Sequence, residues 1–243
     1  MSPRTEYENQ LQQVHDELLL IGSMVEKAIK RSIESLRTRD VELAQRIVDE
    51  DDEIDDRYLA LEELCIDIIA RQQPMASDLR ALITGMQVGS ELERMGDYAE
   101  GIAKISIRMG DEPPLKPLID IPRMADISIG MLRDSLTALN ERDDALARRV
   151  WHTDDEVDQL NDQVYRELLT YMFEDPRNIQ RATWLTWVSH NLERIGDRAT
   201  NIAERVIYLT TGQTPAPDER WPDVGDPTPQ DSTPSPTNDS PSP

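Results

Sequence analysis

The sequence predicts an all-α protein that consists of two tandem three-helix bundles related by an internal pseudo-twofold repeat. Two observations lead to this fold class. Apolar residues recur at three- and four-residue spacing through most of the chain, and runs of β-branched residues are few, which is the pattern of amphipathic helices. In addition, two blocks of the first half return in the second half about one hundred residues later.

Short breaks in the helical period divide the chain into six predicted helices. Asp40 separates the first two helices, residues 73–74 (QP) end the second, and the proline-rich connector 110–117 (GDEPPLKP) follows the third. In the second half, residues 140–143 and 175–176 interrupt the pattern at matching places. The helices are therefore expected at roughly 5–38, 41–72, 76–109, 119–140, 143–173 and 177–210.

The internal repeat covers all three helices of each half. SIESLRTRDVELAQRIVDEDDEID (32–55) aligns with SLTALNERDDALARRVWHTDDEVD (135–158) at an offset of 103 residues. ELERMGDYAEGIA (91–103) aligns with NLERIGDRATNIA (191–203) at an offset of 100 residues. The three-residue difference lies between the second and third helix of each half, where a loop absorbs it. We therefore expect one repeat in residues 1–112 and the other in residues 117–211.

The segment 212–243 differs in composition from the rest of the chain. It contains nine of the sixteen prolines, together with Ser, Thr and Asp, and almost nothing apolar except Trp221. Such a composition cannot bury enough surface to offset the entropy of ordering the chain. We therefore predict a disordered tail that is rich in Pro, Ser and Asp.

The composition also excludes several classes of protein. The formal net charge of −22 is the opposite of the basic footprint of a nucleic-acid-binding protein, and it repels an anionic membrane surface. The single cysteine, Cys65, cannot form an internal disulfide, which is typical of a reducing compartment. The start MSPRTEYENQ is too polar for a signal peptide, and no run approaches the ~18 apolar residues that span a bilayer. These features predict a cytoplasmic protein with no nucleic-acid partner.

A repeated pair of carboxylates marks the candidate site. LERMGD (92–97) places Glu93 and Asp97 one helical turn apart, on the side of the helix away from its apolar seam, and LERIGD (192–197) repeats this. On the preceding helix of each half, one aspartate occupies a position in the apolar seam and a second follows one turn later. Each half thus offers four carboxylates from two helices, and the predicted metal ligands are Asp51, Asp55, Glu93, Asp97, Asp154, Asp158, Glu193 and Asp197.

A poorly solvated carboxylate needs a partner, and the sequence leaves two kinds of partner open. One is a cation, because an oxygen-rich set of this kind suits divalent or iron-type ions such as Mg²⁺, Mn²⁺ or iron, with Zn²⁺ also open. The other is an arginine within the motif itself, Arg94 or Arg194, in an ion pair. Gly96 and Gly196 suit both, because a residue without a side chain lets a neighbouring helix or a ligand approach the backbone closely.

Other residues indicate little chemistry. His190 lies one turn before Glu193, but its counterpart is Ser90, and ferritin-like di-iron sites use the opposite order, Glu-x-x-His, in both halves of the site. The chain has no glycine-rich phosphate loop, no nucleophile with a suitable base and no cofactor fingerprint. We therefore expect no enzymatic activity.

Taken together, these motifs resemble the PhoU family. The resemblance rests on two three-helix units, each with a D-x-x-x-D helix followed by L-E-R-I/M-G-D-x-A-x-x-I-A, and on RQQPMASDLRALI (71–83). It covers about residues 5–210. It implies a pair of three-helix bundles with pseudo-twofold symmetry, in which E/D-x-x-x-D motifs on the bundle surface bind metal ions or clusters. Carried over by position, the implied ligands are the eight carboxylates named above.

The resemblance also implies a function and partners. Members of the family act with a phosphate-specific ABC transporter and a membrane sensor histidine kinase, and they damp the phosphate-starvation response when phosphate is plentiful. The implied protein is a non-enzymatic cytoplasmic regulator, a homodimer, that reaches the inner membrane through its partners. One alternative is a carboxylate-bridged helical-bundle metalloprotein with a redox or metal-storage role. Another is a scaffold whose acidic pairs are ion-paired to arginine.

Overall fold

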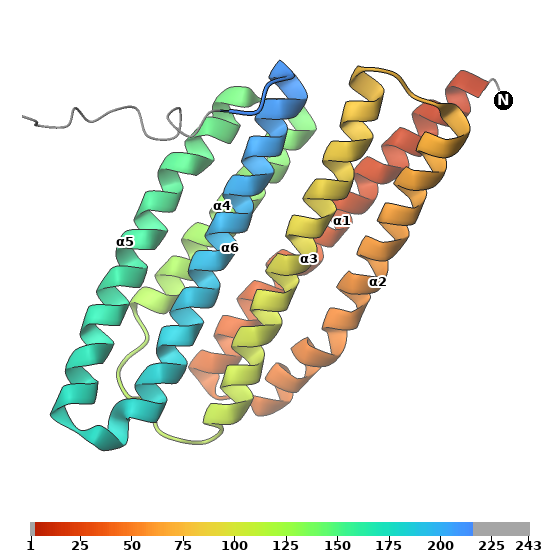
Figure 1. The fold of residues 1–243 in the computed structure, drawn as a ribbon. Coiled ribbons are helices and arrows are strands. Elements are labelled where there is room, and N and C mark those ends of the chain that lie inside the picture. The colour runs from red at the N-terminus through yellow and green to blue at the C-terminus, as the bar shows by residue number, and fades with distance from the viewer. Residues whose placement is uncertain (1–2, 216–243) are drawn as a thin grey trace, which may run out of the picture.

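The computed structural model describes residues 3–215, which form six α-helices and one short 3₁₀ helix (Figure 1). The elements are α1 Pro3–Thr38, α2 Val41–Gln72, α3 Ser77–Met109, α4 Asp120–Glu141, α5 Asp144–Glu174, η1 Pro176–Asn178 and α6 Ile179–Thr211. The predicted all-α fold is confirmed, and each helix end lies within two residues of its predicted position. The predicted tail lies, from residue 216 onward, outside the described residues.

The turns that lead into α2 and α5 are built alike. Asp40 and Asp143, which are counterparts at the offset of 103 residues, cap the two helices. The carboxylate of Asp40 accepts a hydrogen bond from the backbone N–H of Leu43 at 2.8 Å, and that of Asp143 accepts one from Leu146 at 2.9 Å. The residue before each cap has a left-handed backbone, with φ of 59° and 54°. The repeat therefore extends to the turns that orient the two helices carrying the seam aspartates.

Removing either cap is expected to destabilise the protein by about 1 kcal/mol, because the first turn of the helix then keeps an unsatisfied N–H group. Asp40→Ala and Asp143→Ala should each lower the melting temperature, measured by circular dichroism, by about 2–4 °C. The matched controls Asp40→Ser and Asp143→Ser keep an acceptor oxygen and should melt close to the wild-type protein. Alanine variants that melt with their serine controls would contradict the capping role.

The apolar seams that the sequence predicts form the core. α1, α2 and α3 pack against one another in a first unit, and α4, α5 and α6 pack in a second. The seam residues of the two repeated motifs are all 0 % exposed: Val88, Leu92, Met95, Ala99 and Ile102 in α3, and Val188, Leu192, Ile195, Ala199 and Ile202 in α6. Cys65 is a buried free thiol in the same core. The motif helices are thus held by their apolar faces, which leaves their carboxylates at the unit surface.

The two units pack side by side, and each helix at their interface meets its own counterpart. α3 lies against α6, and α1 lies against α4 (Figure 1). A twofold relation requires such pairs, because exchanging the units has to map the interface onto itself. Individual side-chain contacts at this interface also involve corresponding residues of the two units. Asn201 Nδ2 donates to Glu91 at 3.1 Å, and a Cβ added to Gly101, the counterpart of Asn201, would lie 2.9 Å from Asn191 Nδ2.

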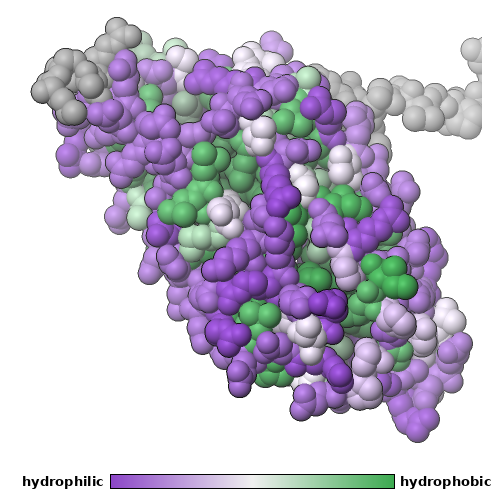
Figure 2. Space-filling view, turned by 180° about the vertical axis from the view of Figure 1, so that it is seen from behind, coloured by the Kyte–Doolittle hydropathy of each residue, from purple (hydrophilic) through white to green (hydrophobic). Residues whose placement is uncertain are grey.

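The surface of the protein is mainly hydrophilic. On the face seen in Figure 2, apolar side chains gather in separate patches between polar and charged ones. Much of the charge lies on helix faces outside the core, such as the exposed acidic face of α2 at Asp52, Glu53 and Asp56. Within residues 3–215, no helix has both the length and the apolar character that crossing a bilayer requires.

Candidate metal centre

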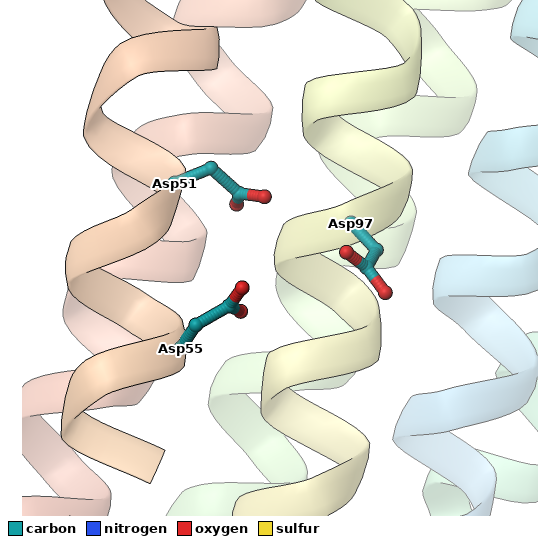
Figure 3. Close-up of side chains that lie close together, drawn as sticks. All are labelled: Asp51, Asp55 and Asp97. Carbon is teal, nitrogen blue, oxygen red and sulfur yellow. The ribbon is translucent and has the colours of Figure 1, made fainter. Parts of the chain in front are cut away.

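Three aspartates from α2 and α3 come together at the surface of the first unit. Asp51 and Asp55 lie one turn apart on α2 and point toward α3, where Asp97 stands at a level between them (Figure 3). One carboxylate oxygen from each residue lies within 4.8 Å of the other two. A single ion between the helices can therefore be reached by all three carboxylates. We call these three residues the aspartate cluster.

The position of Asp51 follows from the helical period of α2. It occupies the apolar seam between Ile47 and Ile54, which are both buried, and it is itself only 9 % exposed. Its carboxylate fits there because α3 carries Gly96 at the contact: a Cβ on Gly96 would lie 3.1 Å from Asp51 Oδ1. Because Gly96 has no side chain, the carboxylate of Asp51 has room at this contact. The fit offsets the cost of about 1 kcal/mol for glycine in a helix interior.

The carboxyl groups of the aspartate cluster hold their protons more strongly than ordinary ones. Burial, and then the negative charges of Glu100 and of the other two aspartates, raises the pKa of Asp51 to about 7. The pKa values of Asp55 and Asp97 are raised as well, each first by burial and then by a neighbouring carboxylate. No described residue forms a hydrogen bond or salt bridge with Asp51. The charge of Lys104 opposes this rise at Asp51 and Asp97, so the protein compensates the ionised cluster only in part.

Two glutamates of α3 flank the aspartate cluster. Glu93, a predicted ligand, lies one turn before Asp97 but outside the group of three, and burial, followed by the nearby aspartates, raises its pKa. Sequence reasoning misses Glu100, whose charge raises the pKa of all three cluster aspartates and which also pairs with Lys104 at 2.5 Å. The available signal for Glu100 was its spacing, because it follows Asp97 by three residues and so shares its helix face.

The second unit repeats the buried aspartate of the first. Asp154 on α5 is 2 % exposed, and a Cβ on Gly196 of α6 would lie 3.0 Å from Asp154 Oδ1. The seam position and the facing glycine are therefore the same in both units. Among the described residues, however, the four predicted ligands of this unit do not form a group of three with oxygens as close as those of the aspartate cluster: Asp154, Asp158, Glu193 and Asp197.

Basic side chains contact the α6 carboxylates of the second unit, although burial and the charge of Asp197 still raise the pKa of Glu193. Arg194 Nη1 lies 3.2 Å from Asp197 Oδ2, and Arg194 Nε lies 3.7 Å from Glu193 Oε2. His190 Nδ1 lies 3.2 Å from the same oxygen of Glu193. In the first unit, Arg94 is exposed and forms no salt bridge with any described residue, and its charge only opposes the rise in the pKa of Glu93 and Asp97. The arginine alternative therefore describes the α6 pair, and the cation alternative is left to the first unit.

The donor set of the first unit fits a hard cation. Carboxylate oxygens are the ligands that Mg²⁺, Mn²⁺ and iron accept, and the buried Asp51 has no protein donor of its own. Asp51, Asp55 and Asp97 would hold the ion, and Glu93 is the further predicted ligand one turn away. A bound ion would supply positive charge between α2 and α3. The second unit fits such an ion less well, because Arg194 already stands at its carboxylates.

Comparison with known families decides the identity of this repeat. The PhoU domain matches the chain twice, at residues 18–106 and 121–206, and each match contains one of the two repeated motifs, LERMGD or LERIGD. The chain belongs to the PhoU family. The resemblance that the motifs indicate is thus confirmed, and both sets of carboxylates lie inside PhoU domains.

Individual PhoU proteins are similar to this chain over most of its length. The PhoU homolog of Aquifex aeolicus is 42 % identical over 204 residues, which cover 84 % of this chain and 92 % of that protein. The homolog of Clostridium acetobutylicum is 40 % identical over 208 residues, which cover 85 % and 95 %. Both are named phosphate-specific transport system accessory proteins. The crystal structure of PhoU from Pseudomonas aeruginosa matches with a TM-score of 0.82 at 37 % identity, covering 85 % of this chain and 100 % of that one.

Proposed function

We propose that this PhoU-family chain is a non-enzymatic, metal-binding regulator of phosphate uptake and of the phosphate-starvation response. The observation that supports it most directly is the buried carboxylate of Asp51, which faces Asp55 and Asp97 across the space left by Gly96. A cluster of this kind suits a hard divalent or iron-type ion. The relatives support the pathway, because they are named accessory proteins of the phosphate-specific transport system.

The bound ion would change how firmly α2 is held against α3. Both helices contribute carboxylates, so they repel each other at the aspartate cluster when it is ionised and metal-free. A cation between them turns this repulsion into a shared attraction. The free and loaded proteins then differ in the α2–α3 pair, and a partner that contacts this pair distinguishes the two states by its differential affinity.

The proposed partners are a phosphate ABC transporter and a membrane sensor histidine kinase, contacted from the cytoplasmic side by a homodimer of this chain. The transporter follows from the names of the relatives. The kinase and the homodimer follow from the family resemblance of the repeated motifs. In phosphate-rich medium the complex would keep the kinase from switching on the starvation genes.

Deleting the gene is expected to leave the phosphate-starvation genes expressed in phosphate-rich medium, in a strain with no other PhoU copy. Transcript levels measure this, and the wild-type gene should restore repression. The variant Asp55→Asn/Asp97→Asn removes two ligands of the cluster while keeping their shape, and it should fail to restore repression. The matched control Asp52→Asn/Asp56→Asn removes two exposed charges from α2 and should restore it.

The outcomes separate the two parts of the proposal. Full repression in the deletion strain contradicts the regulatory role and favours the metal-storage alternative. Restored repression by the Asp55→Asn/Asp97→Asn variant, at wild-type protein level by immunoblot, contradicts the role of the ion and leaves a regulator that works without it.

A further inference from the structure

We propose that this chain binds a metal ion in its first unit only, and that the guanidinium of Arg194 takes the place of the ion in the second unit. The inference rests on the proposed function in one respect, namely that the aspartate cluster of Asp51, Asp55 and Asp97 takes a cation. It goes beyond that function by making the two PhoU domains unequal. One domain responds to metal, and the other has a fixed positive charge of its own.

The contacts of Arg194 carry this inference. Its guanidinium spans both carboxylates of the LERIGD motif, at 3.2 Å from Asp197 and 3.7 Å from Glu193. In the first unit, the aspartate cluster has no such cation shared between carboxylates that lie one turn apart. Arg194 is partly buried by these contacts, with 40 % of its side chain exposed. An ion that entered the second unit would have to displace the guanidinium from both carboxylates.

A histidine adds to the difference between the units. His190 Nδ1 contacts Glu193 at 3.2 Å, so this glutamate has two protein partners on its own helix. The counterpart of His190 in the first unit is Ser90, and Glu93 has no salt bridge with a described residue. Arg94 occurs at the same motif position as Arg194 but remains exposed. The repeated arginine therefore forms salt bridges with the motif carboxylates in one unit, whereas in the other it acts on them only through its charge.

The shared features of the units show that the difference is not one of backbone. Both units place a buried aspartate in the seam, and both face it with a glycine whose Cβ would lie 3.1 Å or 3.0 Å from the aspartate Oδ1. The contact between the glycine and the buried aspartate is thus the same in both units, whereas the charged side chains nearby differ: Glu100 and Lys104 of the first unit correspond to Thr200 and Glu204 in the second. Because His190 and Arg194 are the basic side chains at the α6 carboxylates, removing both should open the second unit to a metal ion.

The test is a Mn²⁺ titration of the chelator-treated full chain, by calorimetry and by metal analysis after equilibrium dialysis. The wild-type protein is expected to bind one Mn²⁺ per chain at concentrations that saturate the first unit. Asp55→Asn/Asp97→Asn should bind none, and Asp158→Asn/Asp197→Asn should still bind one. Arg194→Ala/His190→Ala should bind two. The matched control Arg94→Ala/Ser90→Ala places alanine at the two corresponding positions of the first unit and should still bind one.

Each result decides something different. Two ions per wild-type chain, or one ion that is lost in Asp158→Asn/Asp197→Asn and kept in Asp55→Asn/Asp97→Asn, overturn the inference. A single ion in Arg194→Ala/His190→Ala, with helix content unchanged by circular dichroism, overturns it as well, because the basic side chains would then not be what excludes the ion. No ion in the wild-type protein contradicts the metal part of the proposed function itself.

Discussion

Asp51 alone is expected to lower the stability of the metal-free protein by about 3–4 kcal/mol as the pH rises from about 4 to about 8, because it has to give up its proton inside the folded chain. The pKa of its carboxyl group is about 7 in the folded protein, against an ordinary value of 3.8. Between these values the folded state binds more protons than the unfolded chain, so stability falls with rising pH. Below the ordinary pKa both states hold the proton and the full stability is kept. The raised pKa values of Asp55, Glu93 and Asp97 act in the same direction.

Urea denaturation of the chelated full chain at a series of pH values measures this effect. Asp51→Asn keeps the shape of the side chain and removes its titration, so its stability should change much less with pH and exceed the wild-type value above about pH 7. The control Glu63→Gln, at an exposed position further along α2, should keep the wild-type pH dependence. Added Mn²⁺ should reverse the trend, because an ion binds only the ionised carboxylates. A chelated wild-type protein that gains stability steadily over this range would sink the prediction.

Gly96→Ala is expected to destabilise the protein by about 1–2 kcal/mol, although alanine is the better helix former by about 1 kcal/mol. The added methyl group would lie 3.1 Å from Asp51 Oδ1 and 3.3 Å from Ile54 Cδ1, so both neighbours would have to move. The same shift should displace Asp51 from the other two aspartates and weaken Mn²⁺ binding. Urea denaturation and the Mn²⁺ titration measure the two effects separately.

Gly130→Ala is the matched control for this substitution. Gly130 is also a helical glycine, but a Cβ added to it meets no atom within 4 Å. It should therefore show only the gain in helix propensity, about 1 kcal/mol of added stability. Each variant adds one methyl group to the wild-type protein, and the stabilities of the two variants should differ by about 2–3 kcal/mol. Equal stabilities would show that Gly96 is not needed for the contact with Asp51.

Most of the fold could be predicted from the sequence, because it depends on helical period and on the residues that interrupt it. The α3 seam from Val88 to Ile102 is fully buried, as its spacing predicts. Asp40 was predicted as a break, and it ends the turn as the N-cap of α2. The burial of Asp51 could be predicted for the same reason, because its place in the α2 seam directs its side chain against the neighbouring helices.

The partners of the carboxylates could not be predicted in this way. LERMGD and LERIGD both contain an arginine at the third position, and helical spacing treats Arg94 and Arg194 alike. Which of them pairs with the carboxylates depends on side-chain rotamers, and the helical period does not fix these. Glu93 is a similar case. Its turn of α3 places it beside Asp97, but its distance from α2 depends on how the two helices cross.

The pairing of α3 with α6, and of α1 with α4, is the interface that a homodimer of three-helix subunits would have. In such a dimer every substitution appears twice, so a change that suited one site would also alter the other. The connector 110–117 joins the two subunits in one chain and holds them at a high effective concentration, without a need for strong association. Each copy is then encoded separately. Covalent fusion is therefore what allows a symmetric scaffold to keep open carboxylates in one copy while the other acquires a cation of its own.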